Sequence, residues 1–309
     1  MNLNEVHERF SEDEQCLQYI AKMRWPDGVV RCPICGNDKI VKVERSAESK
    51  NRRKWFYLCQ EPTCRQQFSP TSGTIFQDTH LPLIMWFQAI ALVLNAKKGL
   101  SAMQLQRDLG IGGYKTAWYL YHRIREAMEE GTIPTLGGTV EIDETYVGGR
   151  KRGIGQKAAY KSKQVVMGAV ERGGKLKLRH VRDAKIPTIR AFVEANVGPN
   201  VDRIMTDENR AYPPALKPVL VGRHFTVNHI REEWVKRGTD ISTNTIESAF
   251  SLFKRGIIGN FHKVSIQHLQ RYLNEFSYRY NRRKEDPFTE TVARLCGFSP
   301  LTYRALISE

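Results

Sequence analysis

Four cysteines near the N-terminus constrain this chain more than any other feature of its sequence. They form two pairs, Cys32-Pro-Ile-Cys35 and Cys59-Gln-Glu-Pro-Thr-Cys64, with 23 residues between the pairs. In a reducing compartment a metal explains two such pairs better than disulfides do, because thiolates at this spacing converge on one tetrahedral Zn²⁺. We therefore predict a structural zinc site. The other two cysteines, Cys16 and Cys296, have apolar neighbours and are expected to be buried thiols.

The segment between the cysteine pairs predicts a small β-sheet. Residues 39–43 and 54–58 are strand-like, and a polar stretch separates them. This is the layout of a zinc ribbon, a module that is too small to bury much core and depends on its metal to fold. Its role is either that of a scaffold or, as we favour, contact with DNA, because cations stand beside aromatic residues on one hairpin. The cations are Arg52, Arg53 and Lys54.

Beyond Pro70 the pattern becomes helical. Residues 83–96 are almost continuously apolar, and a second helix is expected between Ser101, a good N-cap, and Gly110. The third predicted helix, residues 114–130, is basic. The second helix, the glycine turn after it and this basic helix predict a helix-turn-helix, with residues 114–125 as the groove-facing element. A plain helical bundle fits the pattern nearly as well. The basic residues of the third helix include Lys115, His122, Arg123 and Arg125.

A glycine-rich junction at residues 131–138 precedes a mixed α/β pattern. Three consecutive strands are expected, followed by alternating helix and strand, which is the order of an RNase H-like fold. In that fold the first and fourth strands are neighbours, so Asp143 and Asp207 would meet although 63 residues separate them. The prediction is a multidomain α/β protein. Its parts are the N-terminal segment and zinc ribbon (1–70), the helix-turn-helix (71–132) and an RNase H-like catalytic domain with C-terminal helices (133–309).

Three acidic residues in separate contexts predict a catalytic metal site. Asp143 and Asp207 end strand-like segments, whereas Glu247 opens a helical one and shares a helix face with Lys254, seven residues later. Hard ions such as Mg²⁺ or Mn²⁺ take carboxylate oxygens as ligands and leave positions for phosphates. We therefore expect a pair of Mg²⁺ or Mn²⁺ ions, held by these three acids, that assist phosphoryl transfer on nucleic acid.

The charge of the chain predicts a polyanionic partner. Lysine and arginine number 48 against 33 acidic residues, and residues 150–190 hold 13 basic residues and two acidic ones. Such a field attracts phosphate backbones, and we expect Arg150, Lys151 and Arg152 to contact DNA. The chain has no apolar run of about 18 residues, and its first residues are polar rather than signal-like. A cytoplasmic, nucleoid-associated prokaryotic protein without membrane contact is expected.

Several motifs together resemble zinc-ribbon-bearing insertion-sequence transposases of the DDE superfamily, in the branch termed ISXO-type. The resemblance extends over nearly all of the chain. It implies that Asp143 and Asp207 are metal ligands and that Lys254 contacts DNA, and we expect the same of Arg255. The motifs are Cys32-Pro-Ile-Cys35, Ile142-Asp-Glu-Thr-Tyr-Val-Gly-Gly149, Thr206-Asp-Glu-Asn-Arg-Ala-Tyr212, Asn244-Thr-Ile-Glu-Ser248 with Phe253-Lys-Arg255, and Glu275-Phe-Ser-Tyr-Arg-Tyr-Asn-Arg-Arg283.

The third metal ligand is either Asn244 or Glu247. The resembled branch often has asparagine there, which Asn244 fits, but a carboxylate offsets divalent charge and an amide does not. The two residues share a helix face, so both are expected at the site, with Glu247 favoured as the ligand. Neighbouring acids are not expected to bind metal, because one lies deeper on its strand and two point to the opposite face. In that order they are Glu141, Glu144 and Glu208.

Two further groups of residues permit more than one interpretation. Glu275, Arg279 and Arg282 form one helical stripe, which is either an ordinary ion pair with a solvated end or an arrangement in which Glu275 orients Arg279 toward DNA or the active site. His224 and His229 fit loop structure, DNA contact or proton transfer. We do not expect them to bind Mg²⁺, because histidine suits zinc better.

Together these features predict a transposase. It would bind the terminal repeats of its own element, cleave DNA by metal-assisted hydrolysis and join the 3′-hydroxyl ends to target DNA, as a homodimer or larger assembly. One alternative is a non-catalytic DNA-binding regulator, against which the intact acidic set argues. The other is a nuclease that cuts without joining, which the sequence leaves open.

Overall fold

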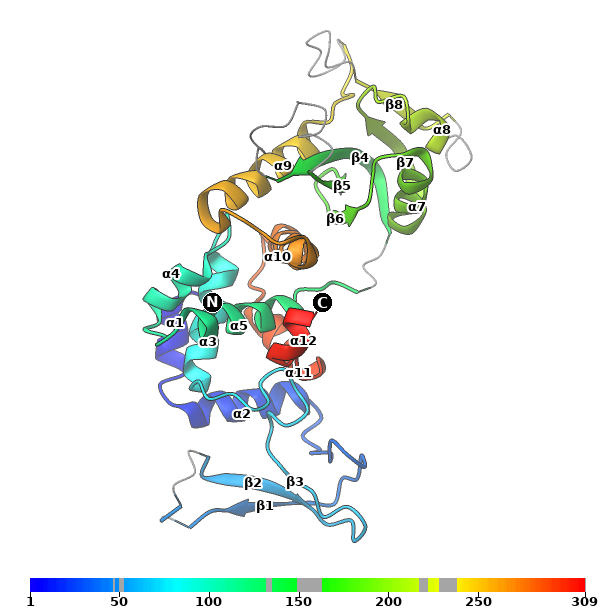
Figure 1. The fold of residues 1–309 in the computed structure, drawn as a ribbon. Coiled ribbons are helices and arrows are strands. Elements are labelled where there is room, and N and C mark those ends of the chain that lie inside the picture. The colour runs from blue at the N-terminus through cyan, green and yellow to red at the C-terminus, as the bar shows by residue number, and fades with distance from the viewer. Residues whose placement is uncertain are drawn as a thin grey trace. The chain divides into compact units, whose positions relative to one another are not determined.

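The computed structural model describes residues 1–46, 48–49, 53–131, 135–148, 163–216, 222–227 and 238–308 (Figure 1). The chain divides into two compact units. The first consists of Met1–Ala96, Ala102–Met128 and Lys284–Glu309, and the second of Lys97–Ser101 and Glu129–Arg283. The C-terminal segment, which the sequence pattern groups with the catalytic domain, thus belongs to the same unit as the cysteine pairs. In the described part of the chain, no helix is long and apolar enough to cross a membrane.

The first unit begins with two helices and a three-stranded antiparallel sheet of order β1-β2-β3. Trp25, at the end of the second helix, packs edge-on against Tyr57 and Phe68 of this sheet. The strands predicted at residues 39–43 and 54–58 are confirmed to within about one residue at each end. The elements are α1 (Leu3–Arg9), α2 (Asp13–Arg24), β1 (Ile40–Glu44), β2 (Trp55–Cys59) and β3 (Gln67–Phe68).

The described part of the first unit contains five further helices. The predicted helix, glycine turn and helix are present: Gly110, with φ +63°, lets the chain turn between α4 and α5. Phe87 of α3 lies 4.8 Å from Phe10 and 5.6 Å from Phe288, so one aromatic cluster joins residues from distant parts of the sequence. The helices are α3 (Leu83–Asn95), α4 (Ala102–Asp108), α5 (Tyr114–Glu126), α11 (Phe288–Gly297) and α12 (Tyr303–Ser308).

The second unit is built on a five-stranded sheet of order β6-β5-β4-β7-β8. β4 pairs antiparallel with β5 and parallel with β7, and β7 pairs parallel with β8. The first and fourth strands of the unit are therefore neighbours, which confirms the RNase H-like order predicted from the sequence. The strands are β4 (Leu136–Val147), β5 (Gln164–Glu171), β6 (Leu176–Val181), β7 (Val197–Thr206) and β8 (His224–Thr226).

Helices cover both faces of this sheet (Figure 1). Val140 and Ile142 of β4 pack with α7 and α8 on one face, whereas Val166 and Val170 of β5 pack with α9 and α10 on the other. Because strand side chains alternate, Asp143 shares the face of α9 and α10. The helical elements are α7 (Ile186–Asn196), α8 (Tyr212–Leu216), α9 (Asn244–Gly256), a π-helical turn η2 (Ile257–Phe261), a 3₁₀ turn η3 (Ile266–His268) and α10 (Leu269–Asn281).

A glycine allows α9 to lie close to the sheet. Gly168 of β5 is the register partner of Asp143. A Cβ atom on Gly168 would lie 2.7 Å from Cζ of Phe250 and 2.8 Å from Cδ1 of Ile246, closer than such contacts ever come. The absence of a side chain at this position therefore brings α9 against the strands, beside Asp143.

Candidate active site and zinc cluster

The carboxyl ends of β4 and β7 form the centre of the candidate active site. Because the two strands are parallel, these ends lie at one edge of the sheet, where ligands of open α/β sheets bind. The register pairs Glu141 with Met205, which places Asp143 and Asp207 two residues further along on the same face. Carboxylate oxygens of Asp143, Glu144 and Asp207 lie within 4.8 Å of one another, close enough to share divalent cations.

Glu144 is a member of this cluster, contrary to expectation. Its side chain leaves the strand on the face of α8, as alternation requires. There its carboxylate accepts hydrogen bonds from Nδ2 of Asn209 (2.8 Å) and from the hydroxyl of Tyr212 (2.6 Å), which hold it at the edge of the sheet beside the two aspartates. The sequence signal was present, since both donors follow Asp207 within five residues, but only the fold shows which carboxylate they contact.

The carboxylates of the cluster disfavour one another's ionisation. Burial, then the charges of Glu144 and Asp207, raises the pKa of Asp143 to about 8. Burial and the charge of Asp207 also raise the pKa of Glu144, while its hydrogen bonds from Tyr212 and Asn209 oppose this. A divalent cation between these groups would remove the repulsion, so the donor set fits a hard metal ion.

α9 supplies the other predicted catalytic residues. Asp143, Glu247 and Lys254 line one cleft of about 470 Å³, together with the exposed Arg255. The carboxylate of Glu247 accepts a hydrogen bond from Oγ1 of Thr243 (2.7 Å), and it lies outside the group of three acids within 4.8 Å. Asn244, the first residue of α9, is exposed. Which of the two binds metal stays a prediction.

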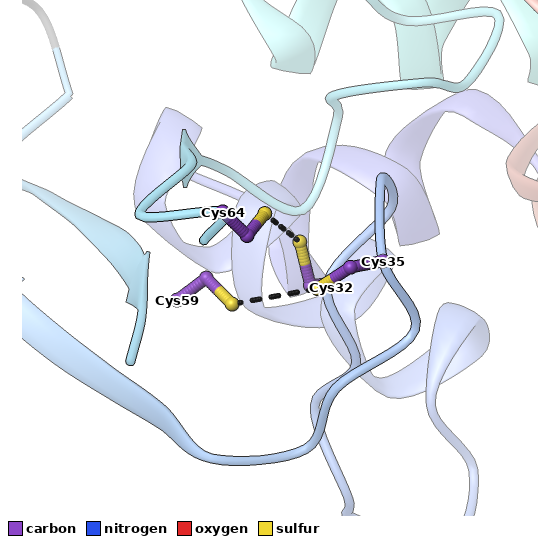
Figure 2. Close-up of side chains that lie close together, drawn as sticks. All are labelled: Cys32, Cys35, Cys59 and Cys64. Atoms are coloured by element: carbon purple, nitrogen blue, oxygen red, sulfur yellow. Dashed lines mark hydrogen bonds between the residues drawn. The ribbon is translucent and has the colours of Figure 1, made fainter. Parts of the chain in front are cut away.

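The four paired cysteines converge in the first unit (Figure 2). The sulfur atoms of Cys32 and Cys64 are 3.7 Å apart, and those of Cys35 and Cys59 are 3.6 Å apart. A regular tetrahedron with Zn–S bonds of about 2.3 Å has edges of roughly 3.8 Å, so the donor set and spacing fit a structural zinc ion. Burial opposes ionisation of Cys32, but hydrogen bonds from the backbone N–H groups of Cys35 and Ile34 and from the side chains of Cys35 and Cys64 together outweigh it and lower its pKa to about 7.

Cys16 and Cys296 are buried, as predicted. Burial raises the pKa of each thiol to about 12. Both therefore remain neutral thiols, unlike a zinc ligand.

Arg123 does not face the solvent, contrary to the expectation for a groove-contacting residue. It is 4% exposed, its guanidinium donates to the carbonyl oxygens of Ile75 and Gln77, and it lies over the ring of Trp86. His122 and Arg125 are also buried. These polar side chains stabilise the interior of the first unit, whereas Lys115, on the first turn of α5, is exposed.

The helical stripe of Glu275, Arg279 and Arg282 on α10 is also largely shielded from solvent. Arg279 and Glu275 form an ion pair of 3.0 Å, with side chains that are 7% and 1% exposed. Arg282 pairs with Glu130 and lies over the ring of Tyr278. The solvated end that one interpretation required is therefore absent from the described stripe, and the predicted DNA contacts of the two arginines are replaced by contacts within the second unit.

The remaining basic residues that were predicted to contact DNA, and the two histidines singled out in the sequence, fall into three groups. Lys54 is exposed, and Arg53 is half-buried and donates to Oγ of Ser69 at 2.5 Å. Nε2 of His224 lies 2.9 Å from Oγ1 of Thr206, and burial lowers the pKa of this histidine. The others lie outside the described residues; they are Arg52, Arg150, Lys151, Arg152 and His229.

Comparison with known protein families gives one match in each of the two units. The ISXO2-like transposase domain matches residues 135–281, and the transposase zinc-ribbon domain matches residues 11–67. An uncharacterized protein in the transposable element ISH50 of Halobacterium salinarum is 28% identical over an alignment of 288 residues, and the match covers 87% of this chain and 91% of that protein.

Among solved structures, the cryo-EM structure of the simian T-cell lymphotropic virus intasome in complex with PP2A regulatory subunit B56 gamma contains a chain that is 12% identical. The match covers 59% of this chain and 62% of that chain, with a TM-score of 0.27. At so low a score the fold assignment rests on the strand order and on the family matches.

We predict one zinc ion per chain, bound by the four paired cysteines. Cys35→Ser and Cys59→Ser should reduce the zinc content of the purified protein below about 0.2 per chain, because three thiolates close a structural site poorly. Elemental analysis measures this, and Cys296→Ala is the matched control that keeps full zinc. Active wild-type protein without zinc would contradict the prediction.

The raised pKa of Asp143 predicts how stability depends on pH in the absence of metal. Since its pKa is about 8 in the folded chain and its ordinary value is 3.8, the folded state binds the extra proton between these values. The free energy of unfolding should therefore fall as pH rises from about 4 to 8. Urea denaturation at pH 5, 6.5 and 8 measures the slope.

Asp143→Asn should flatten this slope, and saturating Mg²⁺ should flatten it as well, because a metal-bound carboxylate carries no extra proton in this pH range. Asp183→Asn is the control, because the pKa of Asp183 is lowered, first by the hydrogen bond from Thr188, and its effect lies below pH 4. Equal slopes for wild type and Asp143→Asn would show that the aspartate is ionised without metal.

Proposed function

Because this chain belongs to the ISXO2-like transposases that carry an N-terminal zinc ribbon, we propose that it cuts the ends of its own insertion element and joins the freed 3′-hydroxyl groups to target DNA. It has the catalytic domain of a DDE-type transposase. The observation that carries the proposal is the convergence of the Asp143, Glu144 and Asp207 carboxylates at the edge of an RNase H-like sheet.

In this proposal Asp143, Asp207 and Glu247 hold two divalent cations, Mg²⁺ or Mn²⁺. Such ions activate water or a 3′-hydroxyl group for attack on a phosphodiester and stabilise the leaving oxygen. Lys254 and Arg255 lie further along α9 and line the same cleft, so their charges are suited to position the phosphate backbone. Glu144, held by Tyr212 and Asn209, adds negative charge on the opposite side of the strand end.

We assign recognition of the element's ends to the first unit. Its helix-turn-helix presents the exposed N-terminal turn of α5, with Tyr114 and Lys115, which is the part of a recognition helix that contacts base edges. The exposed Lys54 adds a cation on the zinc ribbon. The net charge of +15 favours sequence-independent contact with the remaining backbone.

Joining two ends requires two active sites on one DNA assembly, so we propose a homodimer or larger complex. A nuclease that cuts without joining has the same active site and differs only in its products. A non-catalytic regulator is disfavoured, because the clustered acids raise one another's pKa and their repulsion would destabilise a protein that binds no metal. The deciding experiment incubates purified protein with Mg²⁺ and an end-bearing DNA fragment, and separates nicked, excised and strand-joined products.

Substitution of the proposed catalytic acids should impair catalysis and leave DNA binding intact. Asp143→Asn, Asp207→Asn and Glu247→Gln should each lower cleavage and joining by about 10³-fold with DNA affinity retained, since both reactions use the same ions. Asn244→Ala should cost less than about 10-fold, because it removes only a neutral oxygen. Gel-based assays of both steps measure this, with the exposed Asp202→Asn as control. The opposite ranking of Glu247 and Asn244 would make asparagine the third ligand.

Lys115 and Arg123 should behave differently although both lie on α5. Lys115→Ala should reduce the preference for terminal-repeat over random DNA by about 10-fold, as expected for loss of one base contact. Arg123→Met should instead lower the free energy of unfolding by about 1–3 kcal/mol, because it leaves the carbonyl groups of Ile75 and Gln77 without their buried donor. Competition binding and urea denaturation distinguish the two effects. Unchanged preference in Lys115→Ala would refute the recognition-helix assignment.

A further inference from the structure

Glu141, two residues before Asp143 on β4, is fully buried and contacts the N-terminus of α9. Its Oε2 accepts hydrogen bonds from the backbone N–H groups of Thr245 (2.8 Å) and Ile246 (3.0 Å). Its Oε1 accepts from Oγ1 of Thr245 (2.9 Å) and from Nε of Arg172 (2.7 Å). Four donors of the chain thus surround this carboxylate, which identifies it as a structural anion and not as a metal ligand.

α9 depends on this carboxylate because it has no side-chain cap of its own. The first N–H groups of a helix lack partners within the helix and carry partial positive charge. Thr243, in the N-cap position, makes no capping bond with its side chain, and its hydroxyl donates to Oε1 of Glu247 (2.7 Å) instead. The strand therefore supplies the cap of the helix, while the usual capping residue orients the predicted third metal ligand.

Arg172 extends the same anchor to the segment that leads into α9. Besides pairing with Glu141, its guanidinium donates to the carbonyl oxygen of Asp240 (2.8 Å) and to the carbonyl oxygen and Oγ of Ser242 (3.1 and 2.8 Å). One ion pair, between a fully buried carboxylate and a half-buried guanidinium, therefore fixes both the helix start and the chain before it relative to β4.

We propose that Glu141 is a positioning residue for catalysis, which sets the location of Glu247 and Lys254 relative to Asp143 by holding the N-terminus of α9 on the sheet. The inference rests on the proposed metal-dependent cleavage. Glu141 and Asp143 are neighbours on one face of β4, about 7 Å apart along the strand, so a shift of the helix start is transmitted directly to the metal ligands. A displacement of about 1 Å at a catalytic group can cost on the order of 100-fold in rate.

The second contact between α9 and the sheet explains why the unit should survive loss of Glu141. Ile246 and Phe250 pack over Gly168 and belong to a core that also includes Leu273 and Phe276 of α10. Removing the anchor leaves this apolar contact in place. The expected result is a helix that is folded and docked but shifted at its first turn, where Glu247 lies.

The test measures binding of Mn²⁺ alone to the purified full-length chain by electron paramagnetic resonance, and in parallel the cleavage of an end-bearing fragment. Glu141→Gln should weaken Mn²⁺ binding and lower the cleavage rate by about 10- to 100-fold, with DNA affinity unchanged. Asp202→Asn is the control: its side chain is exposed, it lies outside the contacts of Glu141 and Arg172, and it should behave as wild type.

A double-mutant cycle separates positioning from general stability. If Glu141 acts through α9 on Glu247, then Glu141→Gln should weaken Mn²⁺ binding little further in a Glu247→Gln background. Should Glu247→Gln leave Mn²⁺ binding unchanged, Asn244→Ala takes its place in the cycle. Thr245→Val, which removes only the hydroxyl contact to Glu141, should produce a smaller loss of about 3- to 10-fold in the same direction even if Glu141→Gln fails to fold.

Three outcomes count against these proposals and are distinguishable. Wild-type binding and cleavage by both Glu141→Gln and Thr245→Val would overturn the positioning role alone. Full additivity of Glu141→Gln with each α9 substitution would also overturn it, since the loss would then be one of stability. Failure of the wild type to bind Mn²⁺ or to cut DNA would overturn the proposed function, and the positioning role with it.

Discussion

Parallel pairing of β4 with β7 brings Asp143 and Asp207, which 63 residues separate in the sequence, to one edge of a single sheet. The other parts of the catalytic unit are arranged around this edge. Gly168 allows α9 to approach it, the N-terminus of α9 is capped from β4, and Tyr212 holds Glu144 on the far side of the strand end. A shift in the register of these two strands would therefore disturb each group of the proposed metal site.

Two carboxylates on the same face of β4 have opposite electrostatic environments. Glu141 is surrounded by two backbone N–H groups, a hydroxyl and a guanidinium, whereas Asp143 is half-buried among other acids and has its pKa raised to about 8. The difference lies in the supply of donors, because both side chains are removed from solvent to a large degree. An anion whose charge the chain already balances is part of the scaffold, and an anion left unbalanced is available to a cation.

The sequence was sufficient to predict the strand order and the convergence of the paired cysteines, but not the inclusion of the C-terminal helices in the first unit. Paired cysteines have few uses in a reducing compartment, and the strand order follows from alternation and turn residues, so both were predictable. The destinations of arginine side chains were not. In the sequence, a basic residue on a helix looks the same whether it contacts a phosphate, a carbonyl group or a buried carboxylate. Only the tertiary fold shows which of these groups is the partner of Arg123, Arg279 and Arg282. Glu144 was missed for the same reason, since its position depends on Tyr212 and Asn209.

The first unit is assembled from chain segments that precede and follow the catalytic unit. Arg294 of α11 donates to the carbonyl oxygen of Ala127 (2.6 Å), and the N–H of Ile75 donates to that of Leu295 (3.3 Å), so helices that follow the catalytic unit in the sequence close the core around helices that precede it. During synthesis the ribosome must therefore complete the RNase H-like sheet before the proposed DNA-recognition unit can finish folding. A nascent chain would possess its catalytic sheet before its complete recognition unit, and the order of translation would delay site selection until the segment after Arg283 has been made.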